Sequence, residues 1–371
     1  MKMRRFIQCL ALVCLHMLCA LPALGQDARL LDAVRIKGPL TFCDEPVPLE
    51  SPHVRERFEK AMLLALSDRA QVLLWIKRAP RFMPLIDEAL RAKGMPADLK
   101  YLAVAESALR PHAGSPKGAM GFWQLMPETA RKYGMRVDEF IDERRNIYTS
   151  TPAALRLLQA LHDQFSSWTL SAAAYNMGEE GLTAEILEQN SRDYYNLYLP
   201  LETQQFVFRI LAVKLILSAP QRYGFDIHAQ DLYEPLMFDT VEVDCFQETP
   251  IRIVAQAAHT FFKDIKDLNP QVRGYYLQPG HHQVNLPQGS AEGFAARFKK
   301  LVAQNSDERQ TRIYIVREGD SLSEIAERFD VPLAALLIWN RIGLNHSIHP
   351  GDRLVIYPGM LEKDEKSKEI R

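Results

Sequence analysis

Apolar residues between positions 54 and 225 recur with the period of an amphipathic helix. Leu155, Leu158 and Leu161, for example, fall on one face of a predicted helix. No stretch of useful length in this region alternates with the period of two that a half-buried strand requires. The pattern therefore predicts an all-α or nearly all-α first domain.

Prolines and glycines mark the predicted helix ends in this region. The expected starts are Pro96, Pro127 and Pro152, and the expected ends are Gly94, Gly134 and Gly178. Upstream, the four prolines between residues 26 and 52 predict an irregular N-terminal arm.

Beyond Tyr233 the pattern changes to short β-rich runs such as VEVD, YIV and RLVIYP, which flank short helical stretches. The tail also matches itself with a constant offset of 71 residues. We therefore expect two copies of one small α+β module. The matching residues are Ala255 with Ala326, Asn269 with Asn340, Pro279-Gly280 with Pro350-Gly351, Pro287 with Pro358, Val254 with Ile325, Ile265 with Leu336, and Val284 with Val355.

The two ends of the chain have their own composition. Three basic residues precede an apolar run that ends in small residues at Ala23 and Gly25, which predicts a secretory signal peptide over residues 1–25. A retained membrane anchor is the alternative, and Leu18 before Cys19 argues against a lipoprotein. Residues 359–371 are charged and are expected to be a disordered tail.

Charge and cysteine content restrict the classes of binding partner and the cellular compartment that we expect. The net charge of −1 gives no general attraction to nucleic acid, so a nucleic-acid partner is not expected. Only two of the five cysteines, Cys43 and Cys245, lie outside the predicted signal peptide. In an exported, oxidising compartment they either form one disulfide or remain two free thiols.

Glu106 is a carboxylate on the apolar face of a predicted helix between Pro96 and Pro111. Leu99, Leu102, Ala103 and Glu106 share this face because their spacing is helical. Apolar surroundings and a position near the helix C-terminus both favour the protonated form, so the pKa of Glu106 should rise. Such an acid suits cleavage of a glycosidic bond. The alternative is a boundary glutamate that extends to water.

The loop after this helix has the composition of a sugar-binding segment. It combines glycines that allow close backbone approach, two hydrogen-bonding side chains and two aromatic faces on which sugar rings could stack. These residues are Gly114, Gly118 and Gly121, Ser115 and Gln124, and Phe122 and Trp123.

Three blocks of the sequence resemble the lytic transglycosylase family, whose catalytic domain has a goose-lysozyme-like fold. AESALRPHAGSPKGAMGFWQLMP is similar to the family's E-S…G-L-W-Q-F-M-P block. AAAYNMGEEGL resembles its A-Y-N-A-G-x-G block, and LPLETQQFVFRILAVKLI its E-T-x-x-Y-V block. The blocks occur in the family's order, and the similarity covers roughly residues 47 to 225. The resemblance implies a mainly α, lysozyme-like catalytic domain over residues 53–228.

The same resemblance implies roles for individual residues. Glu106 would be the catalytic acid, with Thr203 beside the substrate contact Glu202 in the third block. Tyr175 and Asn176 have packing and helix-ending alternatives, and Glu202 could serve only the positive end of its helix. The implied substrate contacts are Ser107, Ser115, Gly121, Trp123, Gln124, Tyr175, Asn176 and Glu202.

Several positions depart from the family pattern. Phe206 stands where the family usually has Tyr, Met177 replaces a small residue, and Asn146-Ile147 replaces a common Asp-Pro. Asp142 and Glu143 are interpreted as solvated charges rather than catalytic groups.

The resemblance implies peptidoglycan as the substrate and the bond from N-acetylmuramic acid to N-acetylglucosamine as the target. Glu106 would act as general acid and then as base, and the 6-hydroxyl of the muramic acid would close a 1,6-anhydro ring. No cofactor, metal or second acid is expected. One alternative is a catalytically idle cell-wall scaffold, to which Phe206 and Met177 would point. The other is a hydrolytic muramidase with Glu202 as second carboxylate.

The C-terminal copy, residues 311–358, resembles a LysM domain, a βααβ module that binds glycans containing N-acetylglucosamine. Ser321 and Glu324 form a capping-box pattern at its first helix. The upstream copy, residues 235–290, has Thr249-Pro250 in place of Asp320-Ser321, and we expect it to pack or space rather than bind glycan strongly. The implied glycan contacts are Gly319, Asp320, Ser321, Asn340, Pro350 and Gly351.

Together these features predict an exported, multi-domain protein of the periplasm or cell envelope. Peptidoglycan strands are its expected partner, and peripheral association with the envelope or outer membrane stays open.

Overall fold

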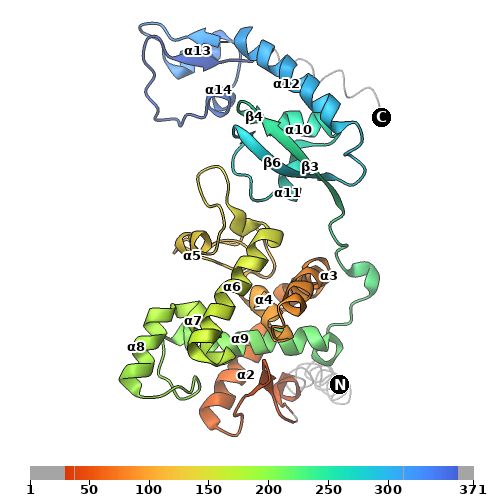
Figure 1. The fold of residues 1–371 in the computed structure, drawn as a ribbon, viewed down its shortest axis with the longest axis vertical. Coiled ribbons are helices and arrows are strands. Elements are labelled where there is room, and N and C mark those ends of the chain that lie inside the picture. The colour runs from red at the N-terminus through yellow and green to blue at the C-terminus, as the bar shows by residue number, and fades with distance from the viewer. Residues whose placement is uncertain (1–29, 37, 312, 358–371) are drawn as a thin grey trace, which may run out of the picture. The chain divides into compact units, whose positions relative to one another are not determined.

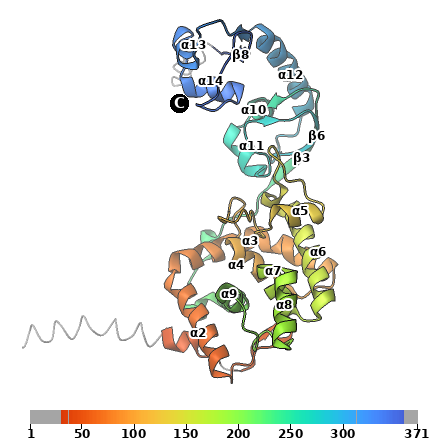
Figure 2. The ribbon, with the colours of Figure 1, turned by 90° about the vertical axis from the view of Figure 1, so that its left-hand side faces the viewer.

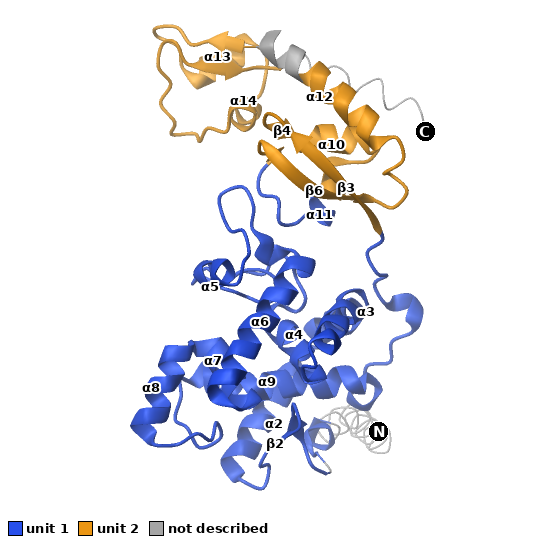
Figure 3. Ribbon diagram, viewed as in Figure 1, with its two compact units in different colours: residues 1–237, 266–274 blue, residues 238–265, 275–371 orange. Residues whose placement is uncertain are grey.

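The computed structural model describes residues 30–36, 38–311 and 313–357, and for residues 306–311 it describes the backbone alone. The described residues form two compact units (Figure 3). Unit 1 runs to residue 237 and also includes residues 266–274, and unit 2 comprises the rest from residue 238. The predicted signal peptide and charged tail lie outside the described residues. Within the described part, no helix is both long and apolar enough to cross a membrane.

Unit 1 is built from helices, as the apolar period predicts (Figure 1). Its α-helices are α2 (Pro52–Ser67), α3 (Arg69–Ala92), α4 (Lys100–Ser107), α5 (Pro127–Lys132), α6 (Ile147–Phe165), α7 (Trp168–Met177), α8 (Glu179–Gln189) and α9 (Leu201–Ser218). Its 3-10 turns are η1 (Ala97–Leu99), η2 (Glu143–Arg145), η3 (Pro220–Tyr223) and η4 (Ala229–Asp231).

The proline signals for helix starts hold at two of three positions. Pro96 precedes η1 and Pro127 is the first residue of α5, where a missing N–H costs nothing. Pro152 is wrong as a start because it lies inside α6, which begins at Ile147. The Asn146 side chain accepts a hydrogen bond from the Tyr148 N–H and so caps α6 one turn earlier than expected.

Helix α9 forms the centre of unit 1 and packs against α2, α4 and α7 (Figure 2). Ten of its 18 residues are buried, among them Phe206 and Leu211. A helix that is apolar nearly all round must be enclosed by other elements. Phe206 is fully buried in this core, so the aromatic ring found in place of the family's Tyr serves packing.

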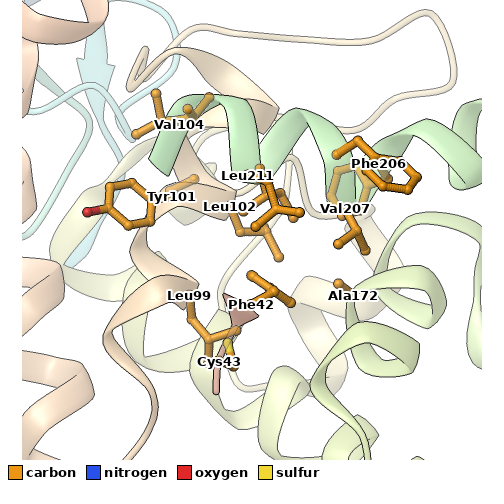
Figure 4. Packing of buried hydrophobic residues seen from close by; sticks show 14 of the residues in the cluster. Phe42, Cys43, Leu99, Tyr101, Leu102, Val104, Ala172, Phe206, Val207 and Leu211 are labelled. Atoms are coloured by element: carbon orange, nitrogen blue, oxygen red, sulfur yellow. The ribbon is translucent and has the colours of Figure 1, made fainter. Parts of the chain in front are cut away.

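The N-terminal arm is more ordered than its prolines predict. Strands β1 (Thr41–Phe42) and β2 (Glu45–Pro46) pair antiparallel around a turn at Cys43 and Asp44. Phe42 is fully buried, and Figure 4 shows it in the core beside Leu99 of η1. The expectation of an irregular arm is therefore wrong for this hairpin, because its apolar residues complete the core of unit 1.

Glu45 fixes the arm to the start of α7. Its carboxylate accepts hydrogen bonds from the backbone N–H groups of Trp168 and Thr169 and from the hydroxyls of Ser167 and Thr169. A negative charge at a helix N-terminus also interacts favourably with the helix dipole. The arm thereby orients the helix that carries Tyr175.

The structure does not contain the disulfide considered between Cys43 and Cys245. Both thiols are free and buried, Cys43 inside the core of unit 1 and Cys245 at the end of β3 (Phe238–Cys245) in unit 2. Burial raises the pKa of each thiol above its ordinary value, which keeps both protonated and unreactive.

Residues 238–357 contain two copies of a strand–helix–helix–strand module, which belong to unit 2 except for segment 266–274. The first comprises β3, α10 (Ile251–Ala257), α11 (Phe262–Leu268) and β6 (Gly280–Pro287), with the short pair β4 (Thr249–Pro250) and β5 (Tyr276–Leu277). The second comprises β7 (Ile313–Ile315), α13 (Leu322–Arg328), α14 (Leu333–Asn340) and β8 (Arg353–Val355). Helix α12 (Phe294–Thr311) connects them. An offset of 71 residues maps the range of α13 onto that of α10 residue for residue.

We predict that Glu45→Gln destabilises unit 1 by about 2 kcal/mol, because the neutral amide accepts weaker hydrogen bonds at the start of α7. Urea unfolding followed by circular dichroism would measure the change. Glu50→Gln, at an exposed position of the same arm, is the control and should leave the midpoint unchanged. Equal stability of the two variants would contradict the role of Glu45.

Candidate active site

Glu106 lies in the last turn of α4, on the face that the helical spacing predicts. Leu99, Leu102 and Ala103 on this face are fully buried, and Glu106 is mostly buried at its edge. The helix ends at Ser107 rather than at Pro111, because the next two residues have positive φ angles of 53° and 57°. The chain therefore reverses directly after Glu106.

Burial raises the pKa of Glu106 to about 7, the direction predicted from its apolar surroundings. The positive charge of Arg209 acts to lower this pKa, and the negative charge of Glu202 to raise it. Arg209 and Glu202 lie on one face of α9 with 4.0 Å between their charged atoms, and both are exposed. Arg209 is not among the residues predicted from the sequence, although its seven-residue spacing from Glu202 indicates a shared helix face.

The glycine-rich loop, residues 113–125, packs its backbone beside α4. The Gly121 N–H donates to the carbonyl of Ala113 at 2.8 Å, and the Met120 N–H donates to that of Leu125 at 3.2 Å. Gly121 has a φ of +82°, and a Cβ there would lie 1.8 Å from the carbonyl oxygen of Arg144. Its role is therefore close packing against η2 rather than the predicted approach to a ligand.

Side chains from other elements hold this loop through its carbonyl groups. Ser107 of α4 donates to Phe122 at 2.7 Å, and Tyr175 of α7 donates to Trp123 at 2.6 Å. Arg144 of η2 donates to Leu125 at 2.9 Å. These donors come from three elements, and they fix the loop backbone in addition to the burial of Phe122 and Trp123 in the core.

The burial of Trp123 and of Ser107 contradicts their predicted roles as substrate contacts. Trp123 is fully buried and donates its Nε1–H to Thr151 at 3.1 Å, and Phe122 is 2% exposed, so neither ring can stack on a sugar. Ser107 is 2% exposed and its hydroxyl bonds to Ala103 and Phe122, which leaves no surface for a ligand.

Tyr175 and Gln124 have both a structural contact and an accessible position. They line a cavity of about 410 Å³ together with residues of α5, α6 and the α7–α8 junction. The Gln124 Nε2 group donates to the carbonyls of Ala113 and Gly121. Burial, followed by the nearby charge of Glu106, raises the pKa of Tyr175 well above its ordinary value, so its hydroxyl stays a donor. Met177, the departure from the family pattern, also lines this cavity.

The remaining predicted contacts of unit 1 differ in exposure. Asn176 accepts a hydrogen bond from the buried hydroxyl of Thr203 at 2.8 Å, which ties the end of α7 to α9. Ser115 accepts one from the Ala119 N–H at 3.1 Å and is partly exposed. Glu202 is exposed in the first turn of α9.

The interpretation of Asp142 as a solvated charge is wrong. Its side chain is 3% exposed and accepts two hydrogen bonds from Arg144, at 2.8 and 2.9 Å. Burial acts to raise the pKa of Asp142, but these bonds hold it below its ordinary value. Its backbone N–H donates to Gln271 within segment 266–274 of unit 1. The sequence gives no sign of this pair, because Asp and Arg are usually exposed.

The predicted glycan contacts of the C-terminal copy are largely used in its own fold. Ser321 and Glu324 form the predicted capping box. Asp320 accepts hydrogen bonds from Tyr314, Arg317 and Arg328, which lower its pKa to about 2. Asn340, the last residue of α14, bonds through its side chain to Leu336 and Val355. Gly319, Pro350 and Gly351 remain exposed.

Two regions of the chain match known protein families. Residues 83–198 match the transglycosylase SLT domain, and residues 314–356 match the LysM domain. The chain contains a transglycosylase SLT domain and a C-terminal LysM domain. The SLT domain is mainly helical and lysozyme-like, and small strands and helices form the LysM region, which confirms the predicted fold class. The SLT match includes Glu106 and Tyr175 but ends before Glu202.

Three known proteins show different extents of similarity. Membrane-bound lytic murein transglycosylase D of Escherichia coli (strain K12) is 33% identical over 296 residues, which are 76% of this chain and 64% of that protein. Peptidoglycan transglycosylase gp16 of Escherichia phage T7 is 37% identical over 29% of this chain and 8% of its own. The 70 kDa soluble lytic transglycosylase of Escherichia coli aligns with a TM-score of 0.34 and 21% identity, over 44% of this chain and 30% of its own.

We predict that Gly121→Ala unfolds the glycine-rich loop of the SLT domain at a cost of about 3 kcal/mol or more, because the new Cβ would overlap the Arg144 carbonyl. Gly118→Ala is the matched control, since Gly118 also has positive φ but open space around its Cβ position. It should cost only about 1 kcal/mol. Thermal unfolding of both variants would separate steric overlap from backbone strain.

We also predict that burial of Glu106 makes stability depend on pH. The folded pKa of about 7 lies above the ordinary value of 4.5, so folding favours the protonated form and stability falls as pH rises between these values. Glu106→Gln removes this titration. Relative to wild type, the free energy of unfolding of the variant should therefore increase by up to about 3 kcal/mol between pH 4 and pH 8. Urea unfolding at each pH would measure it. Parallel pH profiles of the two proteins would contradict the raised pKa.

Proposed function

We propose that this chain is a peptidoglycan lytic transglycosylase that cleaves the β-1,4 bond between N-acetylmuramic acid and N-acetylglucosamine without water. One observation carries the proposal. Glu106 is a mostly buried carboxylic acid with a pKa of about 7 in an SLT domain, so near neutral pH it can both donate and accept a proton. The similarity to lytic murein transglycosylase D supports the substrate class.

In the proposed reaction Glu106 acts twice. It first protonates the glycosidic oxygen as the bond breaks, and it then removes the proton from the muramic acid 6-hydroxyl, which attacks C1 to form the 1,6-anhydro ring. The nucleophile belongs to the substrate, so its attack is intramolecular and gains from proximity. The Tyr175 hydroxyl, which donates to the Trp123 carbonyl, supports the site by fixing the loop beside Glu106.

A hydrolytic muramidase would need a second carboxylate on the opposite side of the bond. Glu202 is the candidate that the sequence offers. It is exposed, lies 4.0 Å from Arg209, and shifts the pKa of Glu106 upward. We therefore assign Glu202 an electrostatic influence on the acid rather than the role of base for a water molecule.

A catalytically idle scaffold is the other alternative, and the two substitutions that suggested it do not affect the acid. Phe206 packs in the core, and Met177 lines the cavity while Glu106 keeps its buried position. These observations favour an active enzyme. The LysM domain would hold it on the cell wall, and we propose the periplasmic cell envelope as its location.

We predict that Glu106→Gln abolishes cleavage of purified cell wall while the fold is retained, because the amide cannot donate and then accept a proton. A zymogram and circular dichroism would test both parts. The wild-type rate should fall as pH rises above about 7, where the acid loses its proton. Residual cleavage by the variant would exclude Glu106 as the acid.

The products distinguish the two reactions. Anhydro ends are lighter by one water than reducing ends, so mass spectrometry of digested glycan should show anhydro ends in products of the wild-type enzyme. Reducing ends alone would support the muramidase alternative instead.

A further inference from the structure

Residues 266–274 lie within the first repeat copy of the sequence but belong to unit 1 (Figure 3), and we refer to them as the strap. Val272 of the strap pairs with Ile141 in an antiparallel bridge. Two backbone hydrogen bonds flank this bridge, from the Arg273 N–H to the Phe140 carbonyl at 2.7 Å and from the Asp142 N–H to the Gln271 carbonyl at 2.8 Å. The strap thus adds one short strand to the segment that leads into η2.

The turn at Asp138 receives a further bond from the strap. The Asp138 carboxylate accepts hydrogen bonds from the N–H groups of Phe140 and Ile141, so the turn satisfies its inner donors by itself. Its outer side is different. The carbonyl of Asp138 accepts a hydrogen bond from the guanidinium of Arg273 at 3.0 Å. The outer side of the turn is therefore held by the strap.

The two repeat copies differ at the strap. Gln271 and Val272 are buried, and the Lys266 ammonium donates to the carbonyl of Val272, which fixes the shape of the strap. At the offset of 71 residues the second copy has Ile342 and Gly343, which are half-buried and exposed. The burial and pairing of the strap are therefore not part of the module fold that the two copies share.

Asp142 connects the strap to the glycine-rich loop. Its backbone pairs with the strap, and its buried carboxylate accepts two hydrogen bonds from Arg144. The Arg144 guanidinium in turn donates to the carbonyls of Gly118 and Leu125, at 2.8 and 2.9 Å. Because a buried guanidinium has few alternative partners, a shift of Asp142 would displace these bonds as well.

The other side of the glycine-rich loop is bonded to the surroundings of Glu106. Ser107, which follows Glu106, donates to the carbonyl of Phe122. Tyr175, which is close enough to Glu106 for their charges to interact, donates to the carbonyl of Trp123. The loop is thus held from two sides, by neighbours of the acid and by Arg144.

We propose that the strap is a positioning element of the active site, which holds the Asp142–Arg144 pair and, through this pair, the glycine-rich loop beside Glu106. The inference rests on the proposed function and gives the first copy a role in that reaction beyond spacing. Gln271 and Arg273 act through other residues, so they are positioning rather than catalytic residues. Displacement of a site by a distant change can lower a rate by about a hundredfold.

Hydrogen exchange of the full-length protein tests the strap without a substrate. Arg273→Pro removes both the N–H and the guanidinium, so amides of residues 113–125 should exchange about fivefold to tenfold faster, as expected for the loss of one or two hydrogen bonds. Helices α2 and α9 should exchange as in wild type. Arg273→Ala keeps the N–H and should show a smaller change in the same loop. Leu344→Pro, at the equivalent and exposed position of the second copy, should change nothing in unit 1.

Kinetics with soluble glycan strands distinguish positioning from a general loss of stability. For Arg273→Pro, kcat should fall about tenfold while KM changes less than about twofold. The rate should also begin to fall at lower pH than in wild type, because water that reaches Glu106 reverses the effect of burial on its pKa. Arg209, Glu202 and Tyr175, whose charges also interact with Glu106, are unchanged in the variant.

A double-mutant cycle tests the route through Arg144. Arg144→Lys keeps the positive charge beside Asp142 but loses the planar set of donors to the loop carbonyls, so kcat should fall. Adding Arg273→Pro to this variant should lower kcat by less than about a further twofold, because both changes act on the same bonds.

Three outcomes would overturn the strap proposal while the enzyme proposal stands. They are fully multiplied effects of the two substitutions, wild-type exchange of the loop in Arg273→Pro, and equally faster exchange in the loop and in α2 and α9. If the wild-type protein cleaves no glycan, the enzyme proposal fails and the role in catalysis fails with it. The exchange measurement then still decides whether the strap holds the loop.

Discussion

The burial of Glu106 is the constraint on which the rest of the site depends. A carboxylate that loses water is costly unless it is paired or protonated, and no charged partner lies within ion-pair distance of Glu106 among the described residues. The protein therefore keeps this group near neutrality through apolar packing around α4, and accepts lower stability at high pH. A closer Arg209 would stabilise the charged carboxylate and would also remove the proton that the proposed reaction needs.

This burial needs a second structural element, because α4 ends directly after Glu106 and cannot enclose the acid alone. The glycine-rich loop packs against α4 and buries Phe122 and Trp123 in the core. Hydrogen bonds from Ser107, Tyr175 and Arg144 also fix its carbonyl groups. Residues that look like ligands in the motif thus serve the backbone, and the accessible polar surface shifts to the cavity beside Gln124.

The sequence predicts the features that follow from regular spacing of its residues. It locates the helices of unit 1, the face of α4 that carries Glu106, and the repeat with its offset of 71 residues. It fails where the outcome depends on tertiary contacts. From the sequence, Trp123 is a plausible platform for a sugar ring, but in the structure its neighbours enclose it. Asp142 has the sequence features of a surface charge, but in the structure it is buried and paired with Arg144. The hairpin at Phe42 likewise forms because unit 1 offers an apolar surface to cover.

The two copies in unit 2 show how one fold can serve different roles. The second copy starts α13 with a side-chain cap, whereas the first starts α10 after Pro250, whose φ of −60° already suits a helix. The residue equivalent to the exposed Gly319 is Glu248, which forms an ion pair with Arg341 of the second copy, whose guanidinium also lies 3.9 Å from the centre of the Tyr276 ring. A loop used to pack one copy against the other has less surface left for a glycan. In the function that we propose, the first copy therefore acts as a spacer and the LysM domain binds the cell wall.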